Sequence, residues 1–397
     1  MRIALLAPLP PEQSGIADYA AAFRQAMSEL GVALTPPLAG GLPQEPARLA
    51  KALASVDWTA FDGAHAELGG GRCGEFLALE WLARHRPGLA LTATVHDPER
   101  LIWRPPSLPA WWRKLPPTLA KLGVLALDPF TLRRERTLAE QLSLLVTLTE
   151  TGRFRLCRRM GLAKSQVVAI AHGNRALPPA PLPPLPPRGP LRLLYFGFVY
   201  RGKGIEDLID ALALLEQQRP GFAAGCALTL AGGTQPDMTF AGGGDYLDFL
   251  RRRLREAGLA RLTLDWRLDV EADAIPTLIQ SCHVMVLPYR ESARLAWLGQ
   301  QRGTSGALSW AAACGRGAIA SNARAFAEEV SHGNGVVYAQ GDVPALADAI
   351  ARMADQPARI AACAEAASRL GQARVWPSTA ERFKKVFLRA QGQGETL

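Results

Sequence analysis

The stretch Tyr195–Asp207, YFGFVYRGKGIED, contains glycines and two cations. It lies where a continuous apolar run ends and apolar residues at helical spacing begin. An apolar run ends at Phe196, and apolar residues at helical spacing begin at Ile205. The pattern predicts a strand, a glycine-rich turn and a helix. Such a turn lets a phosphate approach the backbone and the free N–H groups of the helix start, and Arg201 and Lys203 could hold phosphate oxygens. An ordinary strand-to-helix turn with solvated cations is the alternative interpretation.

Other residues capable of chemistry also stand directly after apolar runs. His96 follows LALTATV, Tyr289 follows HVMVLP, and His172 follows QVVAIA. Gly15 lies in the turn after the first apolar run, where a helix capped by Ser14 or Gly15 is expected to begin. Because ligands of parallel sheets bind at the carboxyl ends of strands, these residues are candidates for binding. A histidine at a strand end is also commonly structural, and His172 is expected mainly to shape its turn.

The 397-residue chain is too long for one hydrophobic core, so its length predicts two domains. Its formal net charge of +9 suits an anionic partner, and a solvated arginine-rich surface is the alternative. No run of about 18 uncharged apolar residues is present, and the N-terminal apolar stretch is expected to be a strand and not a signal peptide. The six cysteines are scattered without a CxxC pair, which indicates reduced thiols in a cytoplasmic protein.

Predicted strands and helices alternate along the whole chain, which is typical of parallel sheets in an α/β protein. The proline-rich residues 176–190 are expected to be a semi-rigid linker. They separate an N-terminal domain, 1–175, from a C-terminal domain, 191–377, and a final helix at about 378–397 is expected to pack back on the N-terminal domain. The strands are expected at residues 3–7, 61–66, 89–95, 142–148 and 166–170, then at 191–196, 227–230, 262–264, 284–287, 318–321 and 336–338.

The ordered set of motifs resembles the retaining, GT-B-fold glycosyltransferases of glycosyltransferase family 4. The segments that carry the resemblance cover nearly the whole chain: PLPPEQSGIADYA, TVHD, IAHGN, FGFVYRGKGIEDLIDAL, LTLAGG, HVMVLPY, SGALSWAAACGRGAIAS and GVVYAQGDVPALADAIARM. The resemblance implies two Rossmann-like, doubly wound domains facing across a cleft. It also implies that a sugar passes from a nucleotide-diphosphate sugar to an acceptor with its anomeric configuration retained.

The resemblance assigns roles to individual residues. His96 would hydrogen-bond the donor sugar, and Lys203 and Arg201 would stabilise the departing diphosphate. The N–H groups at Gly15 and at the helix start near Ser305 would assist them. The expected donor-binding residues are Gly15, Gly197, Tyr289, Ser305, Gly306, Trp310 and Glu328. No metal or other cofactor is expected, because these positive groups could replace it and no DxD-type carboxylate pair stands out.

Two departures from the family's pattern are visible. The family usually carries two glutamates eight residues apart, and their positions fall near Arg302 and on Trp310. The usual ribose contact is therefore absent, and Trp310 is expected either to stack on the nucleotide or to pack in the core. Arg201 lies only two residues before Lys203, closer than the family's arginine, so its role is less secure than that of Lys203.

Cations and tryptophans alternate after His96, a combination typical of segments that contact anionic lipid. Trp103, Trp111, Trp112, Arg113 and Lys114 are the expected acceptor-side or membrane-side residues. A solvated face with packed tryptophans is the alternative. No nucleic-acid-binding module is present. Dinucleotide oxidoreductases carry a GxGxxG motif after the first strand, and this sequence has none there.

The sequence therefore predicts a cytoplasmic glycosyltransferase, peripheral on the inner face of the plasma membrane, that acts on a polysaccharide or lipid-linked glycan. Two alternatives remain open. One is a GT-B enzyme acting on a soluble sugar, as a synthase or a sugar-nucleotide epimerase. The other is a non-catalytic GT-B subunit that binds a nucleotide or a partner enzyme.

Overall fold

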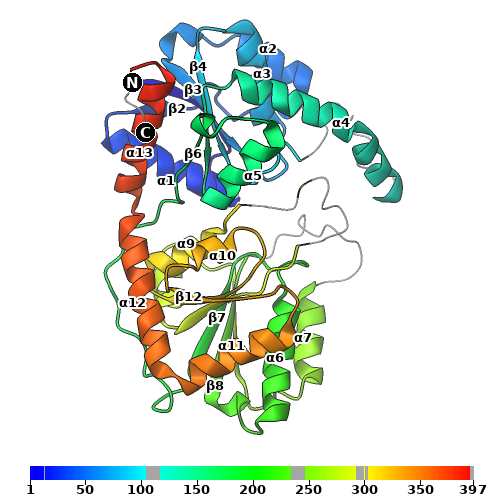
Figure 1. Cartoon of the computed structure of the whole chain (residues 1–397), viewed down its shortest axis with the longest axis vertical. Helices are drawn as coiled ribbons and strands as arrows, with labels where there is room; N and C mark the ends of the chain where they lie inside the picture. Colours follow the sequence, from blue (N-terminus) through cyan, green and yellow to red (C-terminus); the bar gives the residue numbers. More distant parts are fainter. Residues whose placement is uncertain (13, 104–116, 234–245, 292–298, 300–302, 394–397) are drawn as a thin grey trace. The chain divides into compact units, whose positions relative to one another are not determined.

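The computed structural model describes the chain except for residues 13, 104–116, 234–245, 292–298, 300–302 and 394–397. The described chain forms two compact units, each built on one parallel sheet of six strands (Figure 1). Unit 1 comprises Met1–Gly173, Leu295–Thr304 and Trp376–Leu397. Unit 2 comprises Asn174–Arg294 and Ser305–Val375. The C-terminal helix thus belongs to the unit that contains the N-terminus.

Unit 1 has the strand order β2-β1-β3-β4-β5-β6, with all described pairs parallel. Its strands are β1 (Arg2–Leu6), β2 (Ala33–Thr35), β3 (Gly63–Leu68), β4 (Ala90–Val95), β5 (Leu144–Thr147) and β6 (Val167–Ala169). Its helices are α1 (Gly15–Glu29), α2 (Pro46–Ala54), α3 (Gly74–His85), α4 (Pro117–Gln141), α5 (Glu150–Met160) and α13 (Trp376–Ala390).

Both faces of the unit 1 sheet are buried, which explains why most residues of its strands are apolar. On β1, Ala4 and Leu6 face one core cluster, while Ile3 and Leu5 face another. Helix α13 lies beside α1 (Figure 1), where the rings of Phe23 and Phe383 are 4.4 Å apart.

Unit 2 has the strand order β12-β11-β10-β7-β8-β9, again parallel in the described pairs. Its strands are β7 (Leu191–Phe196), β8 (Cys226–Gly232), β9 (Thr263–Leu268), β10 (Val284–Leu287), β11 (Gly317–Ser321) and β12 (Gly335–Tyr338). Its helices are α6 (Ile205–Gln218), α7 (Tyr246–Glu256), α8 (Ile275–Gln280), α9 (Gly306–Ala313), α10 (Phe326–Glu329), α11 (Val343–Asp355) and α12 (Pro357–Ala373).

Every strand expected from the sequence is present, and the α/β fold class is confirmed. The short edge strand β2 and the helices α2, α4, α5 and α12 were not anticipated. Strand β2 has only three residues, too few for a periodic signal. Helix α5 has few apolar residues beside its four arginines, so its apolar spacing is a weak signal. Helix α4 contains Pro129, which argues against one continuous helix.

The proline-rich segment 176–190 contains no helix or strand. It nevertheless lies against unit 2, because Leu177, Leu182 and Leu185 pack on the core of that unit. The guanidinium of Arg316 donates to the carbonyls of Ala180 at 3.2 Å and Pro181 at 2.9 Å. Prolines leave such carbonyls without a local donor, and a buried arginine supplies one.

Candidate functional site

The carboxyl ends of β7 and β10 bring the glycine-rich turn and Tyr289 together in unit 2. Lys203 is only 6% exposed. Its Nζ lies 3.7 Å from the centroid of the Tyr289 ring and 4.9 Å from that of Tyr200. A largely buried ammonium is costly unless it is compensated, and the two aromatic faces provide part of that compensation. The site therefore holds a positive charge in a fixed position.

The backbone of this turn is held against the loop after β10. Gly204 has φ +66°, and a Cβ there would lie 1.8 Å from the carbonyl oxygen of Pro288. The N–H of Arg290 donates to the carbonyl of Gly202 at 2.9 Å. The guanidinium of Arg290 also forms a two-point ion pair with the buried carboxylate of Asp207, with Nε 2.6 Å from Oδ2. These contacts fix the loop that carries Lys203.

Tyr289 also connects the turn to the start of α9. Its hydroxyl lies 3.3 Å from Oγ of Ser305, which caps α9 by accepting from the N–H of Ala307. A Cβ on Gly197 would lie 3.3 Å from the same hydroxyl. Burial raises the pKa of Tyr289, so the hydroxyl stays neutral. Four predicted donor-binding or catalytic residues, Gly197, Lys203, Tyr289 and Ser305, therefore lie close together, and Gly306 is the first residue of α9.

The two arginines near this cluster differ in their surroundings. Arg201 is exposed, and its Cζ lies 5.0 Å and 5.5 Å from the ring centroids of Phe249 and Tyr246 on α7. Arg324, which follows β11, is half-buried and has φ +55°. Its Cζ lies 5.0 Å from the centroid of Tyr289. The structure therefore adds to the Tyr289 cluster a cation that sequence reasoning missed, and it places Arg201 against α7.

The remaining predicted residues of unit 2 are placed as follows. Trp310 on α9 is half-buried and packs against the core of the unit. Glu328 on α10 is half-buried. Its neighbour Glu329 forms an ion pair with Arg374, in which Oε2 of Glu329 lies 2.8 Å from Nη1 of Arg374. No contact described for Trp310 or Glu328 joins either of them to Tyr289.

In unit 1, His96 follows β4 directly and binds a buried carboxylate. Its Nε2 lies 2.7 Å from Oε2 of Glu67 on the neighbouring strand β3. The side chain of His96 is 11% exposed, and that of Glu67 is fully buried. Burial alone raises the pKa of Glu67, but its interactions with His65 and His96 outweigh burial, so the pKa lies below its ordinary value. Glu67 is therefore an ionised carboxylate inside the unit.

The surroundings of this pair are tightly packed. Tyr19 on α1 meets the ring of His96 edge-on, with centroids 4.8 Å apart and an interplanar angle of 88°. A Cβ on Gly69 would lie 2.9 Å from Cβ of His96. The predicted residue Gly15 is the exposed first residue of α1, which Ser14 caps by accepting from the N–H of Ala17 at 3.2 Å. His96 is thus held from three sides.

Of the predicted acceptor-side residues, the structure describes Trp103, whose Nε1 donates to the carbonyl of Asp97 at 3.4 Å. Trp111, Trp112, Arg113 and Lys114 lie outside the described residues. Glu67 was missed at first because the strand was expected to end at Ala66. Its signal was present in the sequence, since His65 and Glu67 are polar at alternate positions of an otherwise apolar run, GAHAEL.

The proteins whose solved structures resemble the chain over most of its length include the following three. HepE of Anabaena in complex with UDP has a TM-score of 0.69 and 17% identity, covering 98% of this chain and 100% of that chain. Sucrose-phosphate synthase of Thermosynechococcus elongatus has a TM-score of 0.67 and 18% identity, covering 98% of each chain. The α,α-trehalose-phosphate synthase (UDP-forming) of Burkholderia xenovorans has a TM-score of 0.59 and 12% identity, covering 86% and 76%. The two parallel six-stranded sheets and this likeness define the fold as GT-B.

The C-terminal part of the chain also matches a protein family. Residues 190–356 match the family model described as Glycosyl transferases group 1. The matched range contains Lys203, Tyr289, Ser305 and Arg324, the residues around the Tyr289 ring. No curated protein matches the sequence.

Proposed function

We propose that this protein is a retaining glycosyltransferase of family 4 that uses a nucleotide-diphosphate sugar as donor. The observation that carries the proposal is the buried ammonium of Lys203, fixed over Tyr289 beside the capped start of α9, within a Glycosyl transferases group 1 match. A fixed cation next to the positive end of a helix suits a diphosphate. UDP or a UDP-forming reaction is named for two of the similar proteins, which agrees with such a ligand.

The residues of the site would have different roles in the reaction. The difficult step is departure of the nucleotide diphosphate as positive charge develops on the sugar ring. Lys203 and Arg324 would stabilise the negative charge on the leaving oxygens, and the N–H of Gly306 at the positive end of α9 would add to this stabilisation. Tyr289 would keep both cations in place as a neutral ring. His96 of unit 1 is assigned to a hydroxyl of the donor sugar, with no metal required.

The first test is a donor screen with the purified full chain. We expect one nucleotide-diphosphate sugar to raise the melting temperature above the others, because stabilisation grows with the ratio of ligand concentration to dissociation constant. That donor should then be hydrolysed or transferred, with a product whose anomeric configuration by NMR equals that of the donor. Excess chelator should leave the rate unchanged.

The outcomes separate the hypotheses. Binding without hydrolysis or transfer would favour a non-catalytic subunit. An inverted product would contradict the retaining mechanism. Loss of transfer with chelator and its recovery with magnesium would contradict the metal-independent role of Lys203 and Arg324.

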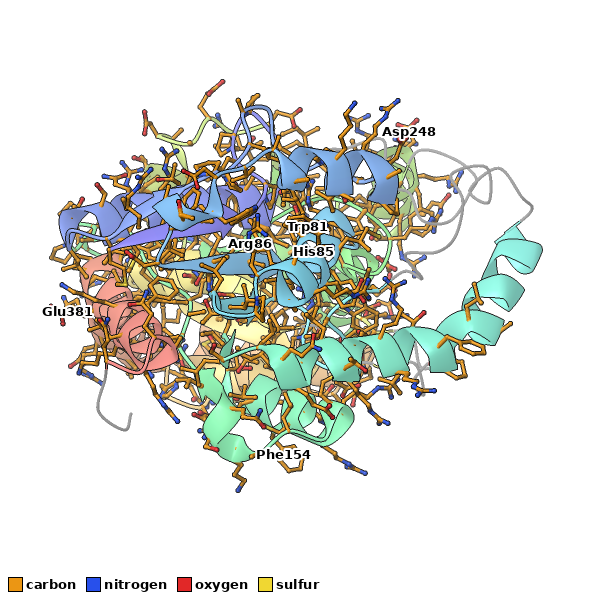
Figure 2. All side chains as sticks on the ribbon, turned by 90° about the horizontal axis from the view of Figure 1, so that it is seen from above. Trp81, His85, Arg86, Phe154, Asp248 and Glu381 are labelled. Carbon is orange, nitrogen blue, oxygen red and sulfur yellow. The ribbon has the colours of Figure 1, made fainter. Side chains whose placement is uncertain are left out.

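For the acceptor we propose a polysaccharide or lipid-linked glycan at the cytoplasmic face of the membrane. The support comes from unit 1, where Phe154 is 58% exposed and Phe130 is 69% exposed. Figure 2 shows Phe154 projecting outward from α5. The same helix carries four arginines, Arg153, Arg155, Arg158 and Arg159. Exposed phenyl rings among cations suit an anionic lipid surface.

A soluble sugar acceptor is the second candidate. It is favoured by the names of two similar proteins, sucrose-phosphate synthase and trehalose-phosphate synthase. Transfer to soluble sugar phosphates in the absence of any lipid-linked glycan would favour it over the membrane-face acceptor.

A further inference from the structure

The pair His96–Glu67 has a chemical consequence that depends on which ring nitrogen carries hydrogen. Glu67 is fully buried and ionised, so its oxygens can only accept hydrogen bonds. The 2.7 Å contact with Nε2 of His96 therefore requires a hydrogen on Nε2. In the neutral ring, Nδ1 then has no hydrogen and is an acceptor. Among the described residues, no hydrogen-bond partner occupies Nδ1.

We propose that Glu67 is a positioning residue that fixes the neutral ring of His96 with hydrogen on Nε2, so that Nδ1 accepts a hydrogen bond from a hydroxyl of the donor sugar. The proposal rests on the proposed function for the identity of the ligand, and on the geometry of unit 1 for the state of the ring.

The surroundings of Glu67 support this role, because they hold the carboxylate in one orientation. His65 on the same strand is fully buried, and its Nε2 lies 3.3 Å from Oε1 of Glu67. The ring of His65 is itself held by Thr92 and Thr94 of β4, at 2.8 Å and 3.0 Å. One carboxylate thus contacts two histidines through different oxygens, and its orientation is set by strands of the sheet.

Tyr19 completes the arrangement by covering the pair. It is 2% exposed, and burial followed by the charge of Glu67 raises its pKa, so it remains a neutral phenol. Its edge-on contact with His96 resists rotation of the imidazole ring. The ring of His96 is therefore fixed by a hydrogen bond at Nε2 and by packing against Tyr19.

The arrangement also predicts which group of a sugar His96 prefers. A lone pair on Nδ1 with a negative charge behind the ring attracts a hydroxyl hydrogen and repels a carboxylate. The sugar position that meets His96 should therefore carry a hydroxyl. A uronic acid that places its carboxylate there should bind less well than the matched neutral sugar.

The test uses the full chain labelled with ¹⁵N-histidine, with His96 assigned from the signal that His96→Asn loses. Long-range ¹H–¹⁵N spectra should show hydrogen on Nε2 and none on Nδ1, with slow exchange at Nε2 because a buried carboxylate holds that hydrogen. Glu67→Gln, which keeps the size of the side chain and removes the charge, should speed that exchange or populate the other tautomer. Glu80→Gln is the matched control, since Glu80 is a buried glutamate of unit 1 that binds Arg134.

With the donor found in the screen, Glu67→Gln should lower kcat about 10- to 100-fold, the range expected for one hydrogen bond to a charged group. Glu67→Gln should also reduce the difference in binding between the neutral sugar and the uronic acid. Glu80→Gln should leave both unchanged. Hydrogen on Nδ1 in the unsubstituted protein, or an unchanged kcat in Glu67→Gln, would overturn the proposal. If the chain transfers no sugar, the proposed ligand is wrong, while the spectra still decide the state of the ring.

Discussion

At the scale of single residues, the cations around Tyr289 differ more than their sequence positions indicate. Lys203 is almost fully buried, Arg324 is half-buried over the same ring, and Arg201 is exposed against α7. A charge in a dry environment interacts more strongly with a phosphate than one in water. We therefore rank Lys203 first, Arg324 second and Arg201 third as contributors to diphosphate binding.

Alanine substitutions at these three positions test the ranking. We expect kcat/KM to fall at least about 100-fold for Lys203→Ala, since a single preorganised donor is worth that much. Arg324→Ala should lower kcat/KM about 10-fold, and Arg201→Ala should lower it by a smaller factor. The measurement is steady-state transfer with the donor varied, with melting temperatures recorded for each variant. A larger loss for Arg201→Ala than for Arg324→Ala would reverse the ranking and restore the interpretation made from the sequence.

At the scale of elements, the strand-turn-helix unit β7–α6 depends on a close backbone approach. Gly204 and Gly258 share a left-handed backbone, with φ of +66° and +70°. The two glycines differ in the room available for a side chain. A Cβ at Gly204 would lie 1.8 Å from the carbonyl oxygen of Pro288, whereas nothing lies within 4 Å of a Cβ at Gly258. Comparing the two positions separates the cost of backbone strain from the cost of collision.

Gly258→Ala should lower the free energy of unfolding by about 1 kcal/mol, the cost of a left-handed backbone for a residue with a Cβ. Gly204→Ala should lower it clearly more, because the turn or the loop after β10 must move. Urea denaturation of both variants measures the difference. Since the turn carries Lys203, Gly204→Ala should also weaken donor binding, and equal losses of stability in the two variants would contradict the collision.

At the scale of the whole molecule, the net charge of +9 is accompanied by aromatic side chains exposed on α4 and α5 of unit 1. A hollow of about 310 Å³ on this unit is lined by Phe130 together with Arg133 and Arg134. Among the described residues, no helix has both the length and the apolar composition needed to cross a bilayer.

Flotation with vesicles tests membrane-surface binding. The chain should float with phosphatidylcholine vesicles that contain phosphatidylglycerol, less with phosphatidylcholine alone, and less at high salt because exposed charges are screened. Phe154→Ser should weaken the binding. Val337→Ser, which removes a 36% exposed apolar side chain from unit 2, is the control. Absence of flotation with anionic vesicles would rule out this surface as a membrane contact.

Much of the element structure could be read from local pattern. The strands before Gly197 and Tyr289 are continuous apolar runs, and they were predicted at their observed bounds. Helix α6 has clear helical spacing, and its start at Ile205 was predicted. Helices α4 and α5 were missed because their charged residues obscure the periodicity, and only packing against the rest of unit 1 selects the helix.

By itself, the sequence determined the α/β class and the strand ends at which Lys203, Tyr289 and His96 lie. These depend on short-range spacing, which the chain displays directly. Only the tertiary structure decided which side chains meet: Arg324 comes to the ring of Tyr289 from β11, and Glu67 comes to His96 from β3. The physical reason is that a parallel sheet places strands side by side that are distant in the sequence. The spacing of residues within one strand does not indicate which other strand will lie beside it.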